Sequence, residues 1–246
     1  MALEKNRINR IQKLILLALL LILALLFVSA CGEKKESAKK QTAQMPSDSF
    51  TFFDLGTQST LSKSVRNDLN QRLGRDAIEH RSIIDLDINF YDFLKTYFPS
   101  LYELNQNLNF PAGERIEHNT VKLMYRYAQK KNIPFDYVEL VFSNYSQHPL
   151  LFGINFQKDE ANIIQTLKTK YGQPQLIDWK DKNGESMYWE KNNDLLIVSL
   201  VPDQFGNPEY QIRIYFVENI KELIATERAE NEKIESQRAK SGKTAF

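Results

Sequence analysis

The chain contains three histidines, and two of them end the same tripeptide, Ile-Glu-His. His80 closes Ile78–His80 and His118 closes Ile116–His118, each behind a glutamate, and the third is His148. Histidine and glutamate are common zinc ligands, and histidine is the usual general base. The residues around the two tripeptides differ, and neither histidine has a second ligand three or four positions away. We therefore expect ordinary surface or hydrogen-bonded histidines and no metal site.

A pair of carboxylates two positions apart is the next candidate for chemistry. Asp85 and Asp87 would project from one face of a strand, where they could bind Ca²⁺ or act as an acid pair. No glycine-turned calcium loop accompanies them, so capping or solvated loop carboxylates are the expected roles. If the protein is a hydrolase, Asp85, Asp87 and His118 are the first candidates for its site.

Three aromatic residues could form a binding face. Trp179, Tyr188 and Trp189 lie on segments that flank the turn-forming pair at 183–184. Aromatic rings on neighbouring strands can line a carbohydrate- or peptide-binding surface, but they pack against each other more often. Packing is the expected role, and binding is the alternative.

Known catalytic patterns do not occur in the sequence. It contains no G-x-S-x-G, no H-E-x-x-H, no phosphate-binding loop and no dinucleotide-binding glycine pattern, and its nine glycines are scattered. We expect no cofactor and favour a protein that is not an enzyme.

A single cysteine, Cys31, follows a segment that is typical of protein export. Residues 1–13 carry a net charge of +3, and the next fifteen residues, Leu14–Val28, are all apolar. A helix of that length would measure about 22 Å, which is short of the ~30 Å hydrocarbon core of a membrane. A basic start, a short apolar core and then small residues form a secretory signal peptide. With one cysteine, the chain cannot form an internal disulfide.

The residues before the cysteine, Val28-Ser29-Ala30-Cys31, resemble the lipobox of bacterial lipoproteins. The resemblance implies a diacylglyceryl group on Cys31, cleavage between Ala30 and Cys31, and a lipid that holds the mature protein on a membrane. The protein would then belong to the bacterial cell envelope and face away from the cytoplasm. Gly32, where an aspartate would favour the inner membrane, indicates the outer membrane if the host is Gram-negative. The alternative is an uncleaved signal anchor.

The charge beyond the leader excludes one class of partner. The whole chain has a net charge of +1, so the part after the basic leader is slightly acidic and has no basic footprint for nucleic acid. Residues 31–49 are polar and lack apolar periodicity, which is typical of a flexible tether. Its lysines could touch anionic headgroups, although acyl chains would make that contribution minor; they are Lys34, Lys35, Lys39 and Lys40.

Residues 50–218 are expected to form one α+β domain whose first half is mainly helical. A short strand is predicted over 84–90, where apolar residues alternate with Asp85 and Asp87. The predicted helices are 61–73, with Ser59 or Thr60 as N-cap and Gly74 past its end; 91–98, with a restart at Pro99; and one after Asn119 with Val121, Met124, Tyr125 and Ala128 on its apolar face.

The second half changes to a period of two, which indicates strands. They are predicted at 138–142, 150–156, 176–180, 186–190, 195–201 and 210–216, with turns at 183–184 and 192–194 and a helix at 163–171 between the second and third strands. Asp159 should cap that helix, and Gly172 and Pro174 should end it. This order predicts an antiparallel sheet with a helix on one face.

Residues 219–246 should form a C-terminal helix that docks through Ile220, Leu223 and Ile224. Beyond Glu227 the apolar stripe thins, so a solvated or frayed tail is expected, with a partner-binding helix as the alternative.

Together these features favour a lipid-anchored binding or structural module of the cell envelope that works through contact with an envelope protein or a ligand. The alternatives are an envelope hydrolase with the carboxylate and histidine site named above, and a lipoprotein that carries a small molecule.

Overall fold

The structure is a computed structural model that describes residues 48–126, 133–159, 161–179, 184–203 and 205–245. The chain divides into two units, residues 1–44 and 45–246. The first unit lies outside the described residues, and so do the predicted signal peptide, the lipobox with Cys31 and most of the tether. Within the described residues, no helix is both long enough and apolar enough to span a membrane.

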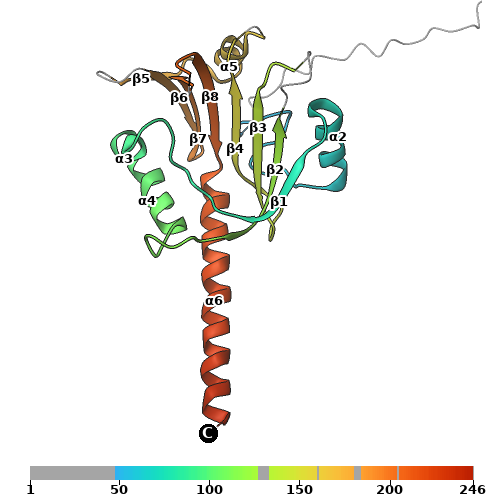
Figure 1. Ribbon diagram of the computed structural model, residues 1–246, viewed down its shortest axis with the longest axis vertical. Helices are drawn as coiled ribbons and strands as arrows, with labels where there is room; N and C mark the ends of the chain where they lie inside the picture. Colours follow the sequence, from blue (N-terminus) through green and yellow to red (C-terminus); the bar gives the residue numbers. More distant parts are fainter. Residues whose placement is uncertain (1–47, 127–132, 160, 180–183, 204, 246) are drawn as a thin grey trace, which may run out of the picture. The chain divides into compact units, whose positions relative to one another are not determined.

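The described residues form an eight-stranded antiparallel sheet (Figure 1). In chain order its strands are β1 (Ala77–Ser82), β2 (His118–Arg126), β3 (Tyr137–Ser143), β4 (Pro149–Phe156), β5 (Gln175–Asp178), β6 (Glu185–Lys191), β7 (Asp194–Pro202) and β8 (Pro208–Tyr215). Their order across the sheet is β1-β2-β3-β4-β8-β7-β6-β5. The predicted α+β class and antiparallel sheet are therefore confirmed.

Helices cover both faces of this sheet, whereas the sequence predicted a helix on one face. On the first face, α2 (Lys63–Leu73) and α5 (Ile163–Tyr171) pack over a core that includes Leu123, Phe152 and Trp189. On the second face, α3 (Phe93–Tyr97), α4 (Pro99–Leu108) and the start of α6 (Val217–Ala245) pack over a core that includes Leu150, Ile197 and Tyr215. The central strands are consequently buried on both sides.

The described chain consists of two halves built on the same plan. A helix on the first face leads into four strands that pair in sequence, first α2 with β1–β4 and then α5 with β5–β8, although α3 and α4 are inserted between β1 and β2 in the first half only. The two helices also end alike: Gly74 has φ 94° and ψ −171°, and Gly172 has φ 86° and ψ −168°. A positive φ of this kind favours glycine. The halves meet where β4 pairs with β8, with Phe152 opposite Ile214.

The helix predicted after Asn119 is wrong, because this segment forms β2. Val121, Leu123 and Tyr125 alternate into the core of the first face, which is the period of a strand. The predicted apolar face of the helix included Val121 and Met124 but not Leu123, which is fully buried. The first half is therefore a mixture of helices and strands, not mainly helical.

The strand predicted over 84–90 is also wrong, although Ile84 and Leu86 are buried as its alternation requires. This segment runs along α4 without pairing to another strand. The amide of Asn105 accepts a hydrogen bond from Leu86 N (3.0 Å), and Asn109 Nδ2 donates to Ile84 O (3.2 Å). Side-chain amides thus satisfy the main chain here, in the place of a neighbouring strand.

The sequence did not predict β1, but the other remaining elements agree closely with the prediction. The helices α2 to α5 and the strands β3 to β8 lie where the pattern placed them. The N-cap of α2 is Ser62, two or three residues later than expected. Asp159 accepts hydrogen bonds from Ile163 N and Ile164 N at the start of α5. Asn192 and Asn193 both have positive φ, as a two-residue hairpin turn requires. Asn183, from the other predicted turn, lies outside the described residues.

The C-terminal helix α6 is confirmed and is longer than expected. Ile220 and Leu223 are buried in the second core, as predicted. The helix continues to Ala245, past the point where fraying was expected, and its side chains are exposed from Arg228 to Lys243.

Candidate functional site

His118, a candidate for metal binding and catalysis, joins β2 to α6 and is only 3% exposed. Its Nδ1 lies 2.7 Å from Glu227 Oε2, and its Nε2 lies 3.1 Å from the carbonyl oxygen of Leu108 at the end of α4. The second oxygen of Glu227 accepts a hydrogen bond from Asn119 N at 2.7 Å. Both ring nitrogens therefore face oxygen atoms of the protein, so neither is directed at a substrate or a metal. His118 is the hydrogen-bonded histidine that the sequence predicted.

The two aspartates of the hydrolase hypothesis have separate roles near α4. Asp85 Oδ1 accepts hydrogen bonds from Asp87 N (3.0 Å) and from Asn105 Nδ2 (3.3 Å), as a capping loop carboxylate does. Burial, with repulsion from Asp85 and Asp92, raises the pKa of Asp87. Among the described residues, no group of three histidines, cysteines or carboxylates could hold a metal ion. Of the other histidines, His80 is exposed on β1 and His148 lies beside the β3–β4 turn.

The three aromatic residues of the predicted binding face are divided between the two faces of the sheet. Trp189 belongs to the first core, whereas Trp179 and Tyr188 pack on the second. Trp179 contacts Phe93 with ring centroids 5.8 Å apart, and Tyr188 contacts Phe98 at 5.0 Å. Packing is thus the role of Trp179, and these three rings do not form one continuous surface.

A buried carboxylate lies beneath a polar pocket at the start of α6. Asp194 is 2% exposed. Its carboxylate accepts one hydrogen bond from Val217 N (3.0 Å) and another from the Thr57 hydroxyl. Burial and the nearby Glu218 raise the pKa of Asp194, although these two hydrogen bonds act in the opposite direction. A carboxyl whose pKa is raised on folding holds its proton more tightly in the folded state. Its contribution to stability is therefore lost as the pH rises through the interval above its ordinary value.

We expect the substitution Asp194→Asn to raise the melting temperature at pH 7, because the amide keeps the acceptor for Val217 N without a buried charge. The gain over wild type should shrink as the pH falls toward 4, where Asp194 itself becomes protonated. The measurement is thermal unfolding by circular dichroism across this pH range. Asp48→Asn, which removes an exposed charge from the same pocket, is the control. A lower melting temperature for Asp194→Asn at pH 7 would contradict the assignment.

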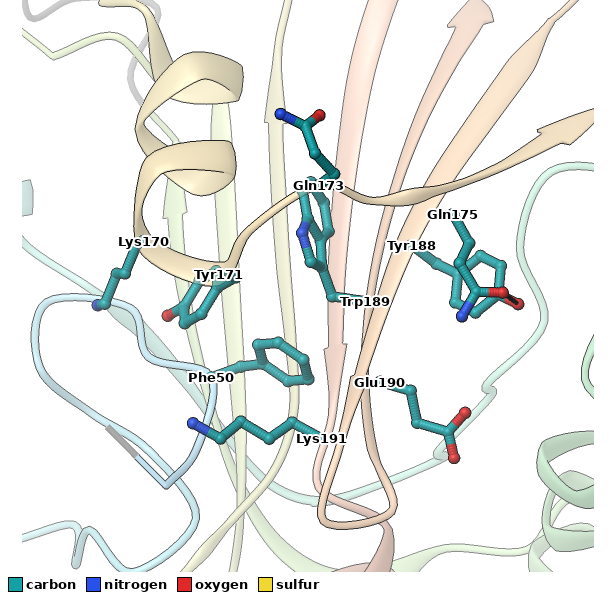
Figure 2. Close-up of a pocket in the computed structure, with 9 residues that line it drawn as sticks. All are labelled: Phe50, Lys170, Tyr171, Gln173, Gln175, Tyr188, Trp189, Glu190 and Lys191. Carbon is teal, nitrogen blue, oxygen red and sulfur yellow. Dashed lines mark hydrogen bonds between the residues drawn. The ribbon is translucent and has the colours of Figure 1, made fainter. Parts of the chain in front are cut away.

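A pocket with both aromatic and polar walls lies where β5 stops short of the end of β6 (Figure 2). It has a volume of about 320 Å³, at the small end of ligand pockets. Phe50, Tyr171 and Trp189 supply aromatic groups, and the polar lining residues are Lys170, Gln173, Gln175, Tyr188, Glu190 and Lys191. We call this site the edge pocket.

Local interactions hold the walls of the edge pocket in place. Trp189 Nε1 donates to the carbonyl oxygen of Gly172 (2.8 Å), which fixes the end of α5 over β6. The Tyr171 hydroxyl accepts a hydrogen bond from Thr51 N (2.9 Å), and its ring meets Phe50 edge-on at 5.0 Å. Residues 50–51, α5 and β6 therefore form one preorganised wall.

The opposite wall is formed by the first residue of β5. The Tyr188 hydroxyl donates to Gln175 Oε1 at 2.6 Å, and Figure 2 shows both side chains on the far side of Trp189 from Phe50. Sequence reasoning singled out Tyr188 and Trp189, but Phe50, Tyr171 and Glu190 were missed. They meet only through tertiary packing, and no local pattern marks them.

Comparisons of the chain with protein-family models, with curated proteins and with solved structures find no match.

Proposed function

We propose that the protein is a lipid-anchored binding module of the bacterial cell envelope, held on its membrane through Cys31. The observation that carries this proposal is the basic segment, the apolar core and Val28-Ser29-Ala30-Cys31 in that order at the start of the chain. Two or three acyl chains, at ~0.8 kcal/mol per buried CH₂, would make the attachment effectively permanent.

The geometry of the described residues favours binding over hydrolysis as the role of the anchored domain. The His118 nitrogens face Glu227 and the Leu108 carbonyl, so this histidine is poorly placed to act as a general base. The edge pocket, in contrast, combines aromatic, amide and charged side chains around a preformed opening. These are the usual components of a ligand-binding site.

The anchor is tested by replacing the acylated residue. Cys31→Ser should abolish incorporation of labelled palmitate and leave the uncleaved precursor, because a hydroxyl does not replace the thiol in lipid transfer. Ser29→Ala keeps a small residue in the lipobox, so it should still be labelled and cleaved. Metabolic labelling followed by mass spectrometry of the N-terminus reads both outcomes. Labelled Cys31→Ser, or wild type that retains residues 1–30, would refute the lipoprotein assignment.

A further inference from the structure

We propose that the edge pocket binds an extended peptide, which adds to the sheet along the open edge of β6. This inference rests on the proposed binding function and names the class of its ligand. On one side, Trp189, Glu190 and Lys191 pair with Leu196, Leu195 and Asp194 of β7. On the other side, β5 pairs only with Glu185–Tyr188. Among the described residues, no strand therefore pairs with Trp189 or Glu190 on that side.

Glu190 presents its main chain to this open side. Lys191 and Asp194 flank the two-residue turn at Asn192 and Asn193, so they form the hydrogen-bonded pair that closes the hairpin. The main-chain direction alternates along a strand, and the N–H and C=O of Glu190 consequently point away from β7. The turns and loops of the described residues contribute no main-chain hydrogen bond to Glu190. An incoming strand could bond to both of these groups.

The chain itself keeps the edge open at this point. Gly172 ends α5 with a positive φ, so the chain changes direction before it reaches the sheet. The sheet pairing of β5 therefore begins only at Gln175, opposite Tyr188. A peptide placed along β6 would continue the line of β5 across the mouth of the edge pocket.

Side chains around the open edge define the pattern of the peptide. Its residue opposite Glu190 would share the face of that carboxylate, so a basic residue is favoured there. Its two neighbours would point to the face of Trp189 and Lys191, into the pocket beside Tyr171, where apolar side chains fit. The expected pattern is apolar, basic, apolar.

Two other occupants fit this site less well. A second copy of the chain, paired through the same edge, would place Glu190 opposite Glu190, and like charges in that position are unfavourable. A sugar needs an open aromatic face, but Trp189 is 5% exposed and Phe50 is 1% exposed. A peptide main chain needs only the polar groups that the edge already presents.

The test is selection of a displayed library of random heptapeptides on the full mature protein. Enriched peptides should show the apolar-basic-apolar pattern. Glu190→Ala keeps the main-chain N–H and loses only the contact between the carboxylate and the basic residue, so it should bind these peptides nearly as well as wild type. Glu190→Pro, which removes the edge N–H, should bind them about tenfold more weakly. Because that N–H has no partner in the sheet, both variants should unfold at similar temperatures.

Methylation of the peptide main chain gives a second measurement that does not depend on any variant folding. N-methylation of the residue opposite Glu190 should weaken binding about tenfold, whereas methylation of either neighbour should change it less than twofold. No enrichment, or methylation effects without a period of two, would overturn the proposal. Dimerisation that Glu190→Pro abolishes would overturn the peptide proposal in favour of a second copy of the chain. Oligosaccharide binding at this pocket would overturn it in favour of a sugar. Each of these results is independent of palmitate labelling at Cys31, so the site and the anchor can fail separately.

Discussion

Replacing His118 with alanine is expected to lower the free energy of unfolding by about 3 kcal/mol. The ring is buried where the end of α4, the start of β2 and the middle of α6 meet. Its removal would leave the Leu108 carbonyl and one oxygen of Glu227 without these partners and would open a cavity. Urea unfolding followed by circular dichroism measures the loss.

His80→Ala is the matched control, because both histidines end an Ile-Glu-His tripeptide. His80 is exposed on the edge strand β1, so its substitution should change stability by less than about 0.5 kcal/mol. Glu227→Gln should cost less than His118→Ala, since the amide keeps an acceptor for Asn119 N. Equal effects at His118 and His80 would show that the buried pair does not hold α6.

Gly184→Ala is expected to destabilise the fold by about 2 kcal/mol, because an added methyl group would overlap a fixed ring. A Cβ at this position would lie 2.2 Å from Cζ3 of Trp179. That indole cannot move aside easily: its Nε1 donates to Ser186 Oγ (3.1 Å), and Phe90 meets it edge-on at 5.4 Å. Thermal unfolding and the near-ultraviolet circular dichroism of the tryptophans should both change.

Gly242→Ala makes the same chemical change at an exposed position of α6 where a Cβ meets no atom within 4 Å. Alanine favours helix over glycine, so this control should be neutral or slightly stabilising. A Gly184→Ala protein with the stability and tryptophan signal of wild type would contradict the close contact.

The second half of the fold was predictable because its signals are local. Asp159 and Gly172 mark the ends of α5, and alternation or short apolar runs mark β6 to β8. In the first half, the same kinds of signal gave the wrong answer at β2 and at residues 84–90. In β2, Val121 and Met124 imitate a helical stripe. In residues 84–90, the alternation reflects packing on α4. There the Asn105 amide accepts the main-chain hydrogen bond from Leu86 N that a neighbouring strand would otherwise accept.

One signal for the second layer of helices was present in the sequence. Along β4 and β7, consecutive residues are apolar and buried, as in Leu150–Phe152 and Leu195–Val198. Such runs indicate strands covered on both faces, not the alternation of a half-exposed sheet. The edge pocket had no comparable signal, because Phe50, Tyr171 and Glu190 are distant in sequence and meet only where β5 ends.

The junction between the two halves determines how the chain must find its fold. Among the described strands, every neighbouring pair is consecutive in the chain except β4 and β8, whose partners Phe152 and Ile214 are about sixty residues apart. Most contacts between consecutive strands close short loops, but β1 and β2 are separated by α3 and α4, and Ala77 pairs with Met124. The fold therefore contains two long-range closures, the pairing of β1 with β2 and the docking of one four-stranded half against the other. Folding speed should be governed by these two encounters.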